Sequence, residues 1–118
     1  MFSVVTETTR QVIGERRLRT LRDIAAWTTD AKSVDEAVRL ASAVLAANPN
    51  DLATARIAAG EPKPGELAFA AGALRLFVTP SARLRLDDEY RGFLALVGSQ
   101  VATALERVRV LQEARERD

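Results

Sequence analysis

The chain has 118 residues, a formal net charge of +1, 47% hydrophobic residues and 28% charged residues, which is typical of one globular domain. So small a net charge favours neither nucleic acid nor an acidic membrane as a partner, and no apolar run is long enough to span a bilayer. Cysteine and histidine are both absent, which excludes disulfides, cysteine nucleophiles, histidine bases and a phosphoacceptor histidine. The first residues lack the layout of a signal peptide. We therefore expect a cytoplasmic protein with no metal site, no cofactor and no catalytic residues.

The chain opens with a β-prone run, Phe2 to Thr6. Thr6, Thr8 or Thr9 can cap a helix that we expect to continue to about Thr28. The spacing of four and then three residues along its apolar stripe predicts one buried or paired face. That stripe consists of Gly14, Leu18, Leu21, Ala25 and Thr28, broadened by Ile24 and Trp27.

A capping box, Ser33 followed three residues later by Glu36, predicts the start of a second helix. Asn48-Pro49 ends it. Alternation over Leu52 to Ala58 then predicts a weak strand, and Ala70 to Val78 predicts a second one. The middle of the chain therefore predicts a small antiparallel sheet of two or three strands.

Gly60 and Gly65 have the spacing of the glycines in a phosphate-binding loop. Glu66 and Leu67 follow, where that motif needs Lys and Ser or Thr, and the intervening prolines remove backbone donors. We therefore expect this segment to be an exposed hairpin connection.

The last third of the chain, Leu86 to Asp118, predicts one long helix capped by Asp87 or Asp88. Phe93 and Leu96 widen its apolar face in the first half, which fits burial against a domain core. Only a narrow seam continues after Gln100, and a narrow seam needs a partner helix. The seam consists of Tyr90, Leu94, Val97, Val101, Ala104, Val108 and Leu111.

Two segments resemble the GAF domains of bacterial multi-domain sensor histidine kinases. ERRLRTLRDIAAWTTDAKSVDEAVRLASAVLAANPND is similar to their opening helices, and ALRLFVTPSARLRLDDEYRGFLALVGSQVATALERVRVLQEARERD to their closing strand and exit helix. MFSVVTETT resembles the last strand of a preceding PAS domain. The resemblance implies a domain over residues 9–118 with signalling helices at both ends. Residues 1–8 would be either the end of a PAS domain or an N-terminal arm.

The middle of the chain departs from the GAF pattern. The family implies a central sheet of five or six strands and a lid over a ligand pocket. In this chain only the segment from Asn50 to Thr79 lies between the second helix and the end of the last predicted strand. That length accommodates two or three strands. The chain also has no counterpart of the family's chromophore cysteine or haem histidine. We therefore expect the pocket-forming middle to be missing.

These observations predict an α+β, truncated GAF-like fold: two N-terminal helices, a small antiparallel sheet and a long C-terminal helix. We expect a non-enzymatic relay and dimerisation module of the two-component type, which forms a homodimer and passes a signal to an effector beyond Asp118. Two alternatives stay open: a small-molecule-binding GAF sensor using Thr54, Arg56 and Arg75, and a stand-alone structural or adaptor protein. The residues expected in the dimer or signalling helices are Leu18, Leu21, Ala25, Tyr90, Leu94, Val97, Val101, Ala104, Val108 and Leu111.

Overall fold

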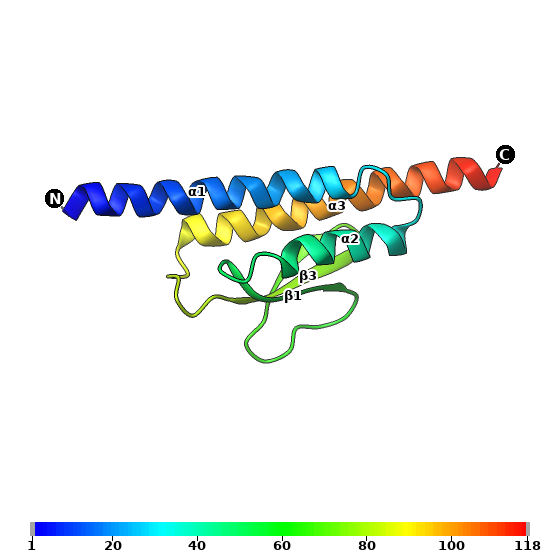
Figure 1. Ribbon diagram of the computed structural model, residues 1–118. Coiled ribbons are helices and arrows are strands. Elements are labelled where there is room, and N and C mark those ends of the chain that lie inside the picture. The colour runs from blue at the N-terminus through cyan, green and yellow to red at the C-terminus, as the bar shows by residue number, and fades with distance from the viewer. Residues whose placement is uncertain (1, 118) are drawn as a thin grey trace.

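A computed structural model describes the backbone of residues 2–117 and the side chains of residues 9–117. The elements in chain order are α1 (Phe2–Trp27), α2 (Val34–Ala46), β1 (Leu52–Ala58), β2 (Leu67–Ala71), β3 (Leu74–Pro80) and α3 (Asp88–Arg117) (Figure 1). The predicted α+β class is therefore confirmed, as are the two N-terminal helices, the long C-terminal helix and the sheet of no more than three strands. None of the helices within residues 2–117 has the length and hydropathy needed to cross a bilayer.

The molecule has three layers. The sheet has the strand order β1-β3-β2 and both pairings are antiparallel. α2 packs on β1 and α3 packs on β2, while α1 contacts both of these helices on the side away from the sheet (Figure 1). α1 and α3 run in the same direction, and each extends past the sheet at opposite ends (Figure 1). The result is an elongated molecule with extents of 63 × 30 × 20 Å.

The predicted strand over Ala70 to Val78 is in fact two strands. β2 ends at Ala71, which pairs with Leu74 at the start of β3, so Gly72 and Ala73 form a two-residue hairpin turn. Gly72 has a φ of 70°, the conformation that a hairpin of this length requires at its first turn position and that glycine adopts without strain. The single-strand prediction was wrong because the apolar residues run through the turn without a break.

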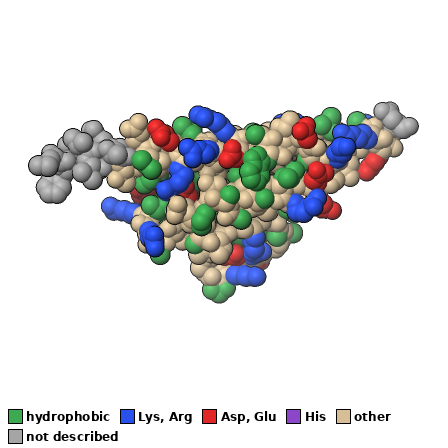
Figure 2. Space-filling model, viewed as in Figure 1, with side chains coloured by type: hydrophobic (Ala, Val, Ile, Leu, Met, Phe, Trp, Pro, Cys, Tyr) green, Lys and Arg blue, Asp and Glu red, His purple; other side chains and the backbone are tan. Residues whose placement is uncertain are grey.

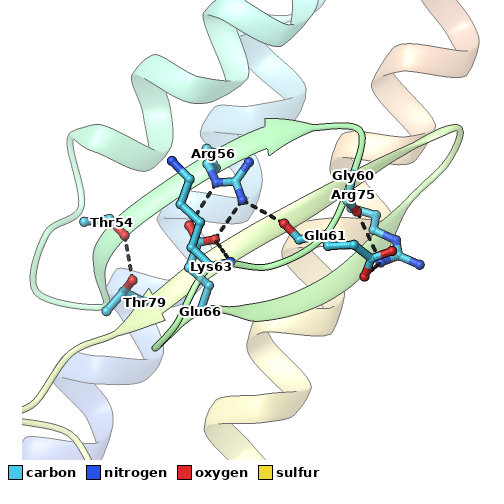
Figure 3. Close-up of polar contacts among 8 residues, drawn as sticks. All are labelled: Thr54, Arg56, Gly60, Glu61, Lys63, Glu66, Arg75 and Thr79. Carbon is cyan, nitrogen blue, oxygen red and sulfur yellow. Dashed lines mark hydrogen bonds and ion pairs between the residues drawn. The ribbon is translucent and has the colours of Figure 1, made fainter.

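The segment from Gly60 to Gly65 is a loop, as predicted, but it is not a hairpin connection. β1 and β2 lie at the two edges of the sheet with β3 between them, so residues 59–66 cross from one edge to the other. Because β1 and β2 each run antiparallel to β3, they are parallel to each other, and parallel strands cannot be joined by a tight hairpin. The crossover lies over the sheet face that points away from the helices (Figure 3).

α1 begins earlier than predicted. Phe2 to Thr6, expected to be extended, is helical, and Thr6, Thr8 and Thr9 lie inside the helix and do not cap it. A lone extended run would leave its backbone groups without a partner strand, whereas a helix pairs them internally. No proline interrupts the segment from Phe2 to Trp27, so the helix continues through it.

The predicted caps of the other two helices are confirmed. The Glu36 N–H donates to the Ser33 hydroxyl oxygen at 3.1 Å, and the Tyr90 N–H donates to Asp87 Oδ1 at 2.8 Å. The capping box is incomplete, because the Glu36 carboxylate accepts from the Lys32 N–H and not from that of Ser33. α2 ends at Ala46, just before the predicted Asn48-Pro49 stop.

Candidate functional site

Most residues of the predicted seam lie inside the chain's own core. Six of them are at most 3% exposed: Tyr90, Leu94, Val97, Val101, Ala104 and Val108. We expected the seam to need a second chain, and this was wrong, because α1 and α2 of the same chain pack against α3. A narrow apolar stripe needs a neighbouring helix, and that neighbour can come from either chain.

The other predicted residues remain at the surface. Leu18 is 53% exposed and Leu111 is 47% exposed; Ala25 is also exposed, and Leu21 is half-buried. Leu96, which we assigned to the domain core together with Phe93, is 55% exposed, whereas Phe93 is buried as expected.

The exposed leucines are divided between the two long helices, with Leu18 on α1 and Leu96 and Leu111 on α3. Leu18 follows Arg17, whose guanidinium carbon lies 5.3 Å from the centre of the Phe93 ring, and Leu96 is one turn after Phe93 on α3. Leu111 is seven residues after the buried Ala104 and therefore continues the same side of α3. We call Leu18, Leu21, Ala25, Leu96 and Leu111 the α1–α3 face.

A buried ion pair ties α1 to the start of the sheet. Arg16 Nε and Nη2 donate to the two carboxylate oxygens of Asp51 at 2.8 and 2.7 Å. The Asp51 side chain is completely buried, and its hydrogen bonds raise the pKa of Arg16. A paired geometry of this kind holds α1 at a fixed position relative to β1.

Tyr90 extends this connection to α3. Its hydroxyl donates to the carbonyl oxygen of Asp51 and accepts from the Ser81 N–H at 3.0 Å. Burial raises the pKa of the Tyr90 phenol, so the hydroxyl stays protonated and can donate. We call Arg16, Asp51 and Tyr90 the strut, because they join α1, the start of β1 and α3.

Sequence reasoning missed the strut. Arg16 and Asp51 are 35 residues apart, and Tyr90 follows Asp51 by 39. No local motif marks such contacts. Asp51 is the last turn residue before β1, and nothing in its sequence context distinguishes it from an exposed turn carboxylate. Trp27 was also misplaced, since we expected it in the core and it is 45% exposed.

The outer face of the sheet carries a separate polar cluster (Figure 3). Arg56 donates to both oxygens of Glu66, at 2.9 and 2.8 Å, and its guanidinium lies 4.1 Å from the centre of the buried Phe77 ring. Glu66 also accepts from the Lys63 N–H at 2.8 Å. The bonds from Arg56, and then that from Lys63, lower the pKa of Glu66 to about 2. This cluster fastens the crossover over Phe77.

All three strand residues considered for ligand binding have partners within the chain (Figure 3). Arg56 pairs with Glu66, the Arg75 guanidinium lies 3.5 Å from the carboxylate of Glu61, and the hydroxyl oxygens of Thr54 and Thr79 are 2.8 Å apart. Their polar groups are thus used to hold the sheet and its crossover together, and do not converge on a hollow.

Hollows lie against α1 and α3, and one of them, of about 300 Å³ beside α1, is lined by Thr9, Val12, Ile13, Arg16 and Leu84. A groove of about 650 Å³ runs between α3, the Gly72-Ala73 turn and the start of α2, and its lining is mainly apolar. A smaller pocket of about 320 Å³ lies between α1 and the segment that leads into α3, and its lining is mainly polar. Across the described part of the chain, no cluster of three or more acidic side chains is placed to hold a metal ion.

Neither a family model, nor a curated protein, nor a solved structure matches this chain. The resemblance to GAF domains therefore stays a prediction. A function has to be inferred from the α1–α3 face, the strut and the hollows.

Proposed function

We propose that this chain is a GAF-like, non-catalytic relay and dimerisation module of a cytoplasmic signal-transduction protein of the two-component type. The observation that carries the proposal is the pair of long parallel helices, α1 and α3 (Figure 1), each of which carries exposed leucine side chains. A module of this kind needs two helices that can change their packing, and it needs no catalytic group.

The partner in this proposal is a second copy of the chain. The net charge of +1 produces little repulsion between two copies, and the exposed Leu18 interrupts a largely charged surface on α1. Figure 2 shows such mixing of hydrophobic and charged side chains on the side of the molecule that it displays. A two-fold axis parallel to α1 and α3 would place the α1–α3 face of one copy against that of the other, as an isologous dimer requires.

The free energy of association from these side chains permits at most a weak dimer. Leu18, Leu96 and Leu111 are each about half exposed, so burying what remains stabilises the dimer by about 1 kcal/mol per side chain. The leucines of both copies then contribute roughly 6 kcal/mol, against an association cost of about 4–15 kcal/mol. Such a balance can be shifted by a small change in helix packing, which suits a relay better than a permanent clamp.

The strut supplies the coupling in this proposal. A displacement of β1 or of the segment after β3 acts on Asp51 or Ser81, and through Arg16 and Tyr90 on both helices of the α1–α3 face. The helices then carry the change along their length, and α3 passes it to an effector beyond Asp118.

Cross-linking tests the proposal, because the chain has no cysteine of its own. Leu18→Cys and Leu96→Cys are introduced separately and oxidised mildly, and the product is measured by non-reducing electrophoresis. A disulfide-linked dimer is expected from at least one of them, since cysteines near the two-fold axis come within bonding range. Arg39→Cys on the exposed side of α2 is the matched control and is expected to stay monomeric. Absence of a cross-link at both test positions, or equal cross-linking at Arg39, would refute the proposed face.

A further inference from the structure

The polar pocket between α1 and the start of α3 has a basic lining. Its volume is about 320 Å³. From α1 it takes residues spaced by three and four, which one helical face presents together. The lining residues are Arg10, Ile13, Gly14 and Arg17 from α1, and Leu84, Arg85, Asp87 and Glu89 from the segment that leads into and begins α3.

Arg17 has an unmet hydrogen-bonding requirement. Its Nε is buried and has no hydrogen-bond partner among the described residues. The guanidinium carbon lies 5.1 Å from the centre of the Tyr90 ring and 5.3 Å from that of the Phe93 ring, so aromatic faces hold the group in place. Ring faces balance the positive charge but do not replace the strong acceptor that a buried N–H needs. A water oxygen or a ligand oxygen that enters the pocket can supply this acceptor.

The positive charge of the pocket is also incompletely balanced. The ion pairs within residues 9–117 are made by Arg16, Arg56, Arg75 and Arg109, and none includes an arginine of this pocket. The three pocket arginines face two carboxylates, Asp87 and Glu89. Asp87 is already engaged, because it accepts the Tyr90 N–H at 2.8 Å as the cap of α3.

We propose that this pocket binds a small oxyanion, the phosphate or carboxylate group of a compact ligand. Guanidinium groups match the geometry of oxyanions, and the amino end of α3 beside the pocket adds partial positive charge. The anion would accept from Arg17 and bridge α1 to Arg85, holding the segment before α3 against α1. The proposal goes beyond the relay function and does not depend on dimerisation, since all lining residues come from one chain.

The side-chain Nε–H resonance of Arg17, followed by NMR, gives the direct test. Inorganic phosphate and succinate are titrated separately at constant ionic strength with sodium chloride. A saturable shift of this resonance with either probe is expected, and the comparison of the two shows whether a phosphate or a carboxylate is preferred. No saturable shift with both probes would overturn the proposal.

Three variants distinguish a specific anion-binding site from nonspecific electrostatic attraction. Arg85→Gln, at an exposed position that the fold does not need, is expected to weaken binding about tenfold, because one charged donor is lost. Glu89→Gln removes a repelling carboxylate and is expected to tighten binding. Arg19→Gln, with the same change of charge on the exposed side of α1, is expected to leave binding unchanged. An equal loss in Arg19→Gln and Arg85→Gln would contradict the assignment.

Discussion

Gly98 sets the distance between α3 and the sheet, and its replacement by alanine is a sharp test of this packing. A Cβ at Gly98 would lie 2.5 Å from the carbonyl oxygen of Ala70 and 3.4 Å from the Cβ of Phe69. The first contact is with backbone, so α3 can accept the methyl group only by moving away from β2. Overpacking of this kind costs about 1–3 kcal/mol. The higher helix propensity of alanine returns up to about 1 kcal/mol.

With the full return from helix propensity, we expect Gly98→Ala to lower the free energy of unfolding by up to about 2 kcal/mol. Gly92→Ala on the same helix is the matched control, because a Cβ there has no heavy atom within 4 Å. The control is expected to gain up to about 1 kcal/mol. For a chain of this length, 1 kcal/mol corresponds to a change in Tm of about 4 °C, which calorimetry resolves easily. Equal and favourable changes in both variants would refute the close approach of α3 to β2.

Two further predictions concern the ion pairs. Asp51→Asn removes the carboxylate that Arg16 pairs with, and we expect urea unfolding to show a loss of stability of about 2–3 kcal/mol. This is less than for a fully buried pair, because Arg16 is partly exposed. A loss no larger than that of the exposed control, Asp30→Asn, would contradict the strut. Because the folded-state pKa of Glu66 is about 2, below its usual 4.5, its contribution is present above pH 4.5 and is lost as the pH falls toward 2. The Tm difference between the wild type and Glu66→Gln should therefore shrink over this pH range, and a constant difference would show that the bond to Arg56 does not stabilise the crossover.

The parts of this fold that depend on neighbouring residues could be predicted from the sequence. The caps at Ser33 and Asp87 act within one helical turn, and both helices begin where these residues place them. β1 also has its predicted bounds, Leu52–Ala58. The hairpin turn at Gly72 was missed because the apolar run on both sides contains no polar break, and only the glycine distinguishes a turn from a continuous strand.

Features that depend on residues far apart in the chain could not be predicted from the sequence. Phe93 and Leu96 have the same apolar character, yet Phe93 is buried, with Arg17 of α1 over its ring, and Leu96 is exposed. The seam residue Val101 could pack against a helix from either chain, and periodicity does not distinguish the two. The strut joins residues more than thirty positions apart, so its existence depends on how the elements pack.

The central claim is that two copies associate through the α1–α3 face, and the mass of the wild-type protein in solution tests it most directly. Sedimentation equilibrium over a range of concentrations is expected to show a reversible dimer with twice the 12.8 kDa mass of one chain. The same measurement on Leu18→Glu, which changes an exposed residue and leaves the core intact, is expected to give a folded monomer. A wild type that stays at 12.8 kDa up to millimolar concentration would contradict the account.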